Sequence, residues 1–554
     1  MHIRTSAVVL FSLAAVLILA SIVADRLGAP PQTTATFILA LGVLCIGIAG
    51  LLSATMRVST YQAAGHALSL PLLAATVTTL SLGLSAAMSK GAPGLDPAAI
   101  VVLAAAALIH ACSVAGALAR AGGYSFGDVI HARFNSRAIA VIVALAGFAI
   151  ALALLVTIGP KAVIGLAQAL HLPRHVAVAL VAGLACLVVL PGGARGLAAA
   201  SGIVVVLALV GWALPSTALL AETAAMRGDL VEQATGFFGA ISPSLDGVGW
   251  VMAALGLLTC LHGPAVTRDA VVARQGLALG VVAMLALGIL AAGVHGITDI
   301  ATARLATIPA DKLPARMFGP DARGEVTFCG ATVRGADDLR RACALASPSD
   351  PVPAARIVVA RPEGGRWQSL VLRQPVAIGA VYDLVLPILL IVAFALIAHL
   401  SARFVVHDIL YRLTGRTGTS SGRLAMQRLI AAGLIIGVAI GLPLRLVPDL
   451  AGAVGKLVMF MAAAVPWPLA LLARWKRADW RAALCGLASA AIAGAALWFG
   501  YLPGAEGFVA GALASLVAGA LAALLFPARD DGSAHAGDVL AGRAPGPLVL
   551  DKSA

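Results

Sequence analysis

The chain has 554 residues, of which 60% are apolar and only 11% are charged. A water-soluble core of this size could not bury so much apolar surface, so the composition excludes a soluble enzyme and indicates an all-α polytopic membrane protein. The net charge of +13 does not indicate nucleic-acid binding, because the basic residues fall mainly in short loops between apolar segments, as they do in proteins that obey the positive-inside bias. The expected macromolecular surrounding is therefore the lipid bilayer.

The apolar stretches have the length of membrane-spanning helices. Residues 7–24 follow Arg4 and suit either a signal sequence or a first span, so both remain open for residues 1–28. About 13 further stretches approach the ~20 residues that a helix needs to cross a bilayer, which makes 14 helices if the N-terminal one is retained. These stretches lie at 34–56, 68–89, 98–119, 138–158, 175–191, 200–221, 248–263, 277–297, 380–402, 426–446, 450–473, 482–500 and 507–526.

The basic residues predict how the helices are oriented. One set of alternate loops is richer in arginine and lysine than the other, and it includes Arg120, Arg274, Arg403 and Arg474. Such loops stay on the cytoplasmic side, so we expect a multi-pass protein of a bacterial-type inner membrane with its C-terminus in the cytoplasm. The sequence leaves the oligomeric state open.

These expectations divide the chain into segments. Residues 29–60 form a helix before the core, and residues 528–554 have the composition of a disordered cytoplasmic tail. The segments between them are a first five-helix repeat at 61–223, a linker with the first two helices of a second repeat at 224–298, an extracytoplasmic loop at 299–378, the last three helices of that repeat at 379–474, and two accessory helices at 475–527.

The long loop contains the only two cysteines that lie in a polar segment, Cys329 and Cys343. The topology exports this loop to an oxidising compartment, so we predict a disulfide between them, with two free thiols as the alternative. The other cysteines lie in apolar runs, and no CxxC pair or histidine cluster has metal-ligand spacing. The sequence therefore predicts no metal and no other cofactor.

One span is interrupted. The apolar run that begins at Trp250 meets His262-Gly263-Pro264 after about a dozen residues, too early for a straight helix to have crossed the bilayer. A non-helical turn at membrane depth survives only where it is buried in protein or lines a wet cavity. The alternative is that the helix ends at Leu261 and the following residues form an ordinary loop.

A second span carries a dense group of hydroxyls. Residues 68–89 place Thr76, Thr78, Thr79 and Ser81 within six residues of an alanine-rich chain. These hydroxyls could donate to a carboxylate or accept around a cation, although Thr and Ser also bond back to the preceding turn without any ligand. Thr259 and His262 of the interrupted span are expected to face the same cavity, because ionisable groups inside a membrane are candidate functional residues.

Six segments resemble one family in the same order along the chain. They are YQAAGHALS at 61–69, GGYSFGDVIHARF at 122–134, VLPGGARG at 189–196, Arg268 after the HGP break, His407-Asp408-Ile409-Leu410, and PLALLARWKRADWRAALCG at 468–486. From Tyr61 to Phe526 the chain thereby resembles the sodium:solute symporter family, and within it the acetate permease, or cation/acetate symporter, branch.

The resemblance implies a LeuT-like fold, in which two five-helix repeats of opposite orientation, here 68–221 and 248–473, enclose a site between broken helices. It also implies a secondary active transporter that moves a small organic anion, such as acetate or another short-chain monocarboxylate, by alternating access. No paired carboxylates, activated nucleophile or metal triad indicates an enzyme. The expected substrate-binding residues are Thr76, Thr78, Thr79, Ser81, Thr259, His262 and Gly263.

The sequence departs from the family at the coupling-ion site. The two positions that supply side-chain oxygens to sodium in these symporters are Val392 and Ala393 here, and neither has a hydroxyl. A hard cation needs several oxygen ligands, so sodium coupling is doubtful. Proton coupling through His262 or His399, uncoupled movement, and a non-transporting sensor or partner subunit that kept the fold all remain open.

Overall fold

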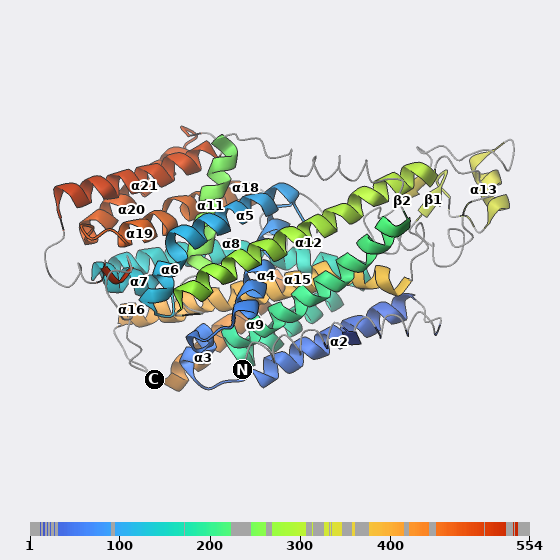
Figure 1. The fold of residues 1–554 in the computed structure, drawn as a ribbon, viewed down its shortest axis with the longest axis horizontal. Helices are drawn as coiled ribbons and strands as arrows, with labels where there is room; N and C mark the ends of the chain where they lie inside the picture. The colour runs from blue at the N-terminus through green and yellow to red at the C-terminus, as the bar shows by residue number, and fades with distance from the viewer. Residues whose placement is uncertain are drawn as a thin grey trace.

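A computed structural model describes most of the chain. The described residues are 31–89, 95–170, 172–222, 245–261, 267, 269–305, 313, 326–331, 333, 335–345, 357–359, 376–414, 420–441, 450–502, 505–527, 536 and 538–540, with a few positions before 31. Among them, ten helices are long and apolar enough to cross a membrane, and two shorter apolar helices accompany these. The helices form one long bundle (Figure 1).

The first part of the bundle is formed by residues 31–222. Its elements are α2 (Pro31–Leu52), α3 (Val58–Ala63), the short helix η1 (Ala64–His66), α4 (Leu70–Met88), α5 (Pro97–His110), the π-helix η2 (Ala111–Ala115), α6 (Gly116–Ala121), α7 (Phe126–Phe134), α8 (Arg137–Leu170) and α9 (Arg174–Glu222).

The second part of the bundle and the described pieces of the long loop lie within residues 245–525. Its elements are α11 (Leu245–Leu261), α12 (Ala270–Leu305), β1 (Val326–Phe328), α13 (Ala336–Cys343), β2 (Ile357–Val359), α15 (Val376–Arg403), the π-helix η8 (Phe404–Leu410), α16 (Tyr411–Thr414), α17 (Ser420–Gly441), α18 (Leu450–Ala464), α19 (Pro466–Ala473), α20 (Trp480–Trp498) and α21 (Glu506–Leu525).

Two predicted spans, 175–191 and 200–221, lie on the single element α9, which bends at Gly193. This residue has φ 52° and ψ −138°, a conformation that side chains with a Cβ rarely adopt. A Cβ at this position would also lie 2.4 Å from the backbone oxygen of Tyr61. Glycine is therefore required here for both the backbone conformation and the close approach of α3.

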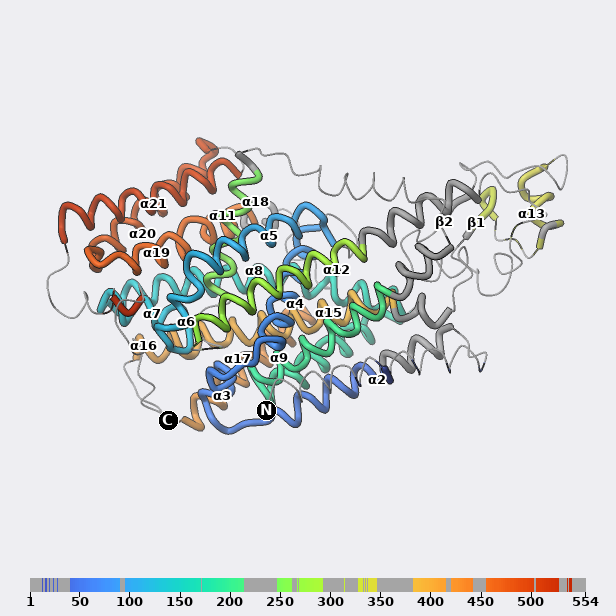
Figure 2. The backbone as a smooth tube through the Cα atoms, viewed as in Figure 1, coloured from blue at the N-terminus to red at the C-terminus, as the bar shows by residue number. Residues whose placement is uncertain are grey.

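Helix α15 is the centre of the bundle, and almost all of its described side chains are buried. It packs against α2, α4, α8, α9 and α17, as Figure 2 shows for the middle of the molecule. Its sequence is apolar on every side, which suits a helix that is surrounded by others.

Helices α4 and α15 run in opposite directions. The ammonium of Lys161, far along α8, donates to the carbonyls of Ala86 (2.6 Å) and Ser89 (2.6 Å), so the C-terminal end of α4 lies beside the later part of α8. The C-terminal end of α15 continues into η8, which packs against α7 and α8. The beginning of α8 follows α7 directly, so the two C-termini lie at opposite ends of the bundle.

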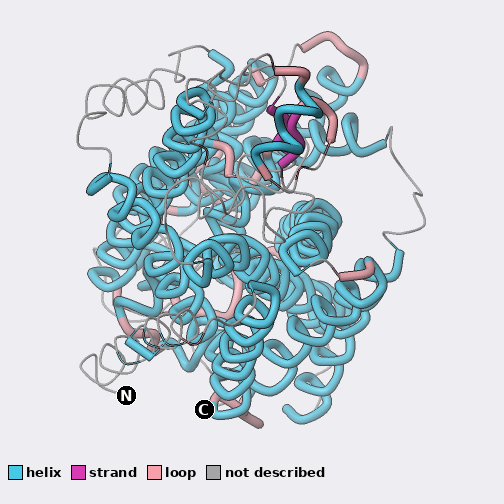
Figure 3. Tube along the Cα trace, turned by 90° about the vertical axis from the view of Figure 1, so that its right-hand side faces the viewer, coloured by secondary structure: helices cyan, strands magenta, loops and turns pink. Residues whose placement is uncertain are grey.

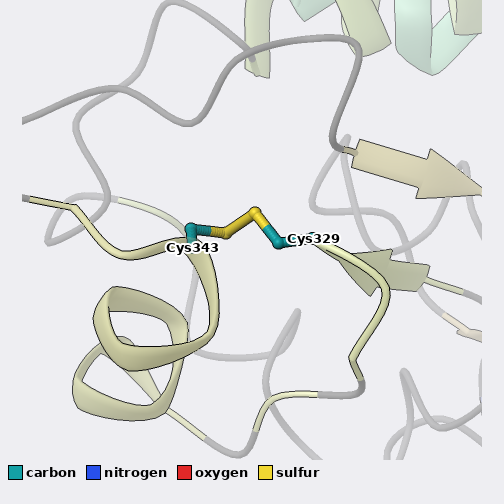
Figure 4. The surroundings of a disulfide bond; sticks show 2 residues. All are labelled: Cys329 and Cys343. Atoms are coloured by element: carbon teal, nitrogen blue, oxygen red, sulfur yellow. A yellow bond between two sulfur atoms is a disulfide. The ribbon is translucent and has the colours of Figure 1, made fainter.

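The strands and α13 belong to the long loop and lie together at one end of the molecule (Figures 1 and 3). β1 and β2 pair antiparallel, with Val326 opposite Val359. Cys329 and Cys343, the pair predicted to be bonded, are joined with a Cα–Cα distance of 5.3 Å, and the bond ties the end of β1 to α13 (Figure 4).

The tail differs from the predicted disorder where it is described. Residues 536 and 538–540 are helical, and Ala536, Val539 and Leu540 are buried. Leu540 packs with residues of α6, α7 and α19, and its carbonyl accepts a 3.2 Å hydrogen bond from Arg120. This short segment therefore docks against the end of the bundle opposite to the strands.

Candidate functional site

The four hydroxyls of α4 divide into two pairs. Thr76 donates to the carbonyl of Leu72 (2.8 Å), and Thr78 donates to those of Ala74 (2.9 Å) and Gly280 (3.1 Å). Thr78 therefore joins α4 to α12. The hydroxyls of Thr79 and Ser81, in contrast, are fully buried and have no hydrogen-bond partner. A buried hydroxyl without a partner costs about 1–3 kcal/mol, so Thr79 and Ser81 are the members of the group that a ligand would satisfy.

Thr259 is placed differently from the expectation. Its hydroxyl donates to the carbonyl of Leu255 (2.7 Å) and lies 3.3 Å from Nδ1 of His110 on α5. The structure thus brings Thr259 to α5, and no described contact joins it to the α4 hydroxyls. Helix α11 ends at Leu261, while His262 and Gly263 lie outside the described residues.

The chain is also irregular before α4. Ala64, Gly65 and His66 have positive φ values of 50°, 68° and 56°, so the backbone between α3 and α4 leaves the right-handed helical region. The next residue, Ala67, forms an isolated antiparallel bridge with Thr267, which follows the end of α11. The irregular segments at the first helix of each half therefore touch, although the predicted break lay in only one of them.

A buried histidine and a buried arginine lie one turn apart on α15. His399 and Arg403 are each 2% exposed, and their spacing of four residues places them on one helix face. The ring of His399 meets Tyr61 edge-on at 5.1 Å, and the backbone of Gln62 is its one hydrogen-bonding neighbour among the described residues. The Nε and Nη2 atoms of Arg403 are buried without partners.

His399 lies near the depth of the α4 hydroxyls, and Arg403 lies about 6 Å farther along α15. Helices α4 and α15 meet where Gly83 faces Ala393. Because the helices are antiparallel and rise 1.5 Å per residue, Thr79 lies about 6 Å from this contact and His399 about 9 Å, both toward the same end. Each helix thus contributes buried polar side chains to the same part of the bundle.

The two positions expected to bind the coupling ion are packed with apolar atoms. Val392 and Ala393 are buried, and the side chain of Ala393 contacts Gly83 so closely that a Cβ on this glycine would lie 2.5 Å from it. The side chains of Val392 and Ala393 therefore offer a cation no oxygen ligand, and the two helices are in close contact at this point.

A polar cluster that the sequence did not predict joins α7 to η8. The carboxylate of Asp128 lies 3.0 Å from Nε2 of His407 and accepts hydrogen bonds from Arg412 and from the backbone N–H of Tyr124 (2.7 Å). Asp408 and Arg412, four residues apart, lie 3.4 Å from each other. Two of the segments on which the family resemblance rested, 122–134 and 407–410, therefore meet here, a contact that the sequence did not predict.

Asp408 completes this cluster from the other side of Arg412. It is fully buried and accepts a 2.5 Å hydrogen bond from the hydroxyl of Ser125, while its Oδ2 has no partner. Oxygen and nitrogen atoms of Asp128, His407 and Asp408 lie within 4.8 Å of one another, a spacing that could hold a metal ion. Arg412 already supplies positive charge to both carboxylates, so we assign the cluster as an ion-pair network.

The charges of this network control the ionisation of Asp128. Burial raises the pKa of Asp128, but the positive charges of His407 and Arg412 and the hydrogen bond from Tyr124 outweigh it, so the pKa lies well below its usual range. Asp128 is therefore a carboxylate at every physiological pH. The network links η8, at the end of α15, to α7 across nearly 300 residues of sequence.

The chain matches no protein-family model and no curated protein sequence. Among solved structures, a Na+-coupled sialic acid symporter in a substrate-bound outward-open state is similar over 90% of this chain and 98% of its own, with a TM-score of 0.64 and 14% identity. MHP1, a nucleobase-cation-symport-1 family transporter in a closed conformation, is similar over 88% of this chain and 98% of its own, with a TM-score of 0.46 and 12% identity. The first likeness confirms the predicted LeuT-like fold.

Proposed function

We propose that the protein is a secondary transporter that moves a small organic anion across a membrane by alternating access. The observation that carries this proposal is the buried His399 in the middle of a LeuT-like bundle, near the depth of the unpartnered hydroxyls of Thr79 and Ser81, with the buried Arg403 one turn farther along α15. Proteins of this fold bind their solutes between the first helices of the two repeats. An anion would supply acceptor atoms to these four side chains.

The charge of the site favours an anion. A buried guanidinium is costly unless it is paired, and the nearest carboxylates, Asp128 and Asp408, bond to Arg412 and Ser125. A substrate carboxylate would pair with Arg403 and accept hydrogen bonds from the α4 hydroxyls. In this proposal the backbone N–H groups around His262 and Gly263 complete the site. The resemblance to the acetate permease branch suggests acetate or another short-chain monocarboxylate as the substrate.

The substrate proposal predicts which hydroxyl matters. Replacing Thr79 by Val, which keeps its shape but removes a hydroxyl with no structural partner, should lower uptake at least tenfold without changing the amount of protein in the membrane. Uptake of labelled acetate and other short-chain acids into cells with and without the gene measures this. Thr157→Val is the matched control, because Thr157 is exposed on α8 and bonds only to the carbonyl of Ala153 (2.8 Å).

A failure of uptake has a defined meaning. If none of several short-chain acids enters faster with the gene than without it, the substrate class is wrong. If Thr79→Val and Thr157→Val behave alike while uptake occurs, the protein transports its substrate through some other site.

The coupling proposal follows from the absence of hydroxyls at Val392 and Ala393. We propose that a proton, carried by His399, takes the place of sodium, with His262 as a second possible carrier. In proteoliposomes an inward proton gradient should accelerate uptake severalfold and a sodium gradient should not, and His399→Gln should remove the response to pH. Ser401→Ala is the control on the same helix, because its hydroxyl bonds only to the carbonyl of Ile397 (2.8 Å). Sodium-dependent uptake would contradict this assignment.

A second candidate is a non-transporting membrane sensor or partner subunit that kept the fold. The close contact of Ala393 with Gly83 favours it, because helices α4 and α15 would have to separate for a cation to enter there. Binding of a short-chain acid to the purified protein without any uptake into proteoliposomes would support this function.

A further inference from the structure

Three arginines lie in a row along one face of the helix formed by α5, η2 and α6. Nη1 of Arg474 donates a hydrogen bond to the carbonyl of Ser113. The guanidinium of Arg274 lies against Gly116, where an added Cβ would be 2.7 Å from Nε of Arg274. Arg120 follows Gly116 by one turn. The positions 113, 116 and 120 are three and four residues apart, so they share a face. The arginines come from α12, from the end of α19 and from α6 itself.

Carboxylates do not neutralise this arginine row. None of the ion pairs between described residues includes Arg120, Arg274 or Arg474. The Nε atoms of Arg120 and Arg474 are buried and have no partner, and Arg274 and Arg474 repel Arg120 through their like charge. Carbonyls of Leu540 and Ser113 accept one hydrogen bond each from Arg120 and Arg474, and an anion with several acceptor oxygens would satisfy the donors that remain.

The same helix face continues into an apolar surface. Ile109 is four residues before Ser113 and is 42% exposed, and Leu108 beside it is 46% exposed. Cys112 is exposed as well. These residues are exposed on a helix long and apolar enough to span a membrane, so their side chains are available to the acyl chains of lipids. The arginines lie at the end of this helix that the loop charges assign to the cytoplasmic surface.

We propose that the arginine row binds the phosphate headgroup of an anionic phospholipid, with an acyl chain lying along Leu108, Ile109 and Cys112. In an anionic lipid the phosphate lies at one end and the hydrocarbon chain extends from it. The phosphate would lie at the arginines, and the chain would lie along the apolar side chains of the same helix. Basic pockets between membrane helices on the cytoplasmic side bind such headgroups. The bound lipid would join α6, α12 and the end of α19 through one anion.

Native mass spectrometry of the purified full-length protein tests this proposal, with phosphatidylglycerol as the probe and phosphatidylcholine as the neutral lipid. Phosphatidylglycerol should bind more tightly, and Arg274→Gln, at an exposed position, should weaken it about fivefold while the variant elutes as folded protein on size-exclusion chromatography. Removing all three arginines should weaken it about a hundredfold. Arg57→Gln removes the same charge from an exposed position on the same side of the membrane and should change binding by less than twofold.

Two results would overturn the proposal. One is equal loss of binding in Arg274→Gln and Arg57→Gln, which would mean that only the general positive charge matters. The other is that inorganic phosphate at millimolar concentration occupies the site while phosphatidylglycerol does not bind, which would assign the row to a soluble anion. The measurement does not depend on uptake, so it stands or falls separately from the transport proposal.

Discussion

Replacing Asp128 by Asn is expected to lower the unfolding free energy by about 3–5 kcal/mol, because it leaves Arg412 buried beside one carboxylate and removes the acceptor of His407. The side chains of Asp128 and Arg412 are only 11% and 10% exposed, so water cannot replace the lost partner. Chemical denaturation of the purified protein, monitored by tryptophan fluorescence, measures the change.

Two further variants test the cause of this loss. Asp338→Asn breaks an ion pair with Arg341 whose side chains are 39% and 78% exposed, and it should cost less than about 1 kcal/mol. The double variant Asp128→Leu with Arg412→Met removes both charges of this pair but leaves the buried carboxylate of Asp408 without its arginine, so it should recover only part of the stability. Equal effects of Asp128→Asn and Asp338→Asn would show that the network at η8 is not buried in solution.

The lowered pKa of Asp128 predicts how pH acts on this network. A carboxyl group whose pKa is lower in the folded state stabilises that state above its ordinary pKa, near 4, and the contribution is lost as pH falls through the lowered value. Between pH 8 and pH 5 the stabilisation by Asp128 should therefore stay constant. Histidine side chains titrate in this interval, so a change in uptake there would come from His407 of the same network or from His399 and not from Asp128 itself.

Gly256→Ala is expected to prevent normal packing of the bundle. A Cβ at Gly256 of α11 would lie 1.6 Å from the carbonyl oxygen of Ala462 on α18, and both atoms belong to helix backbones that no rotamer change can move. The helices would have to separate, at a cost of about 3 kcal/mol or more. The yield of folded protein on size-exclusion chromatography should fall sharply.

Gly437→Ala is the matched control for this prediction. Gly437 lies inside α17, and nothing lies within 4 Å of a Cβ there, so the substitution should stabilise the helix by about 0.5–1 kcal/mol. A wild-type yield of Gly256→Ala would contradict the close crossing of α11 and α18. That crossing positions the first helix of the second repeat, so the same result would also weaken the proposed site.

Local features of the sequence were sufficient to predict the class of fold. Long apolar runs require a bilayer because only lipid accepts so much apolar surface, and they fixed most of the helices without any knowledge of their neighbours. The pairing of Cys329 with Cys343 was also accessible, because both belong to one short polar segment. The dense group of hydroxyls in residues 68–89 also predicted that α4, which carries Thr79 and Ser81, belongs to the candidate site.

The tertiary structure alone decided which polar atoms are left without partners. Thr78 and Thr79 are adjacent in the sequence, yet one bonds to Gly280 of α12 and the other to nothing. Asp128 and His407 meet although 279 residues separate them. Helices such as α15 are apolar all round, so their sequence does not show which side faces which neighbour. The partner of a buried polar group depends on the helix opposite it, and only the packed bundle determines that helix.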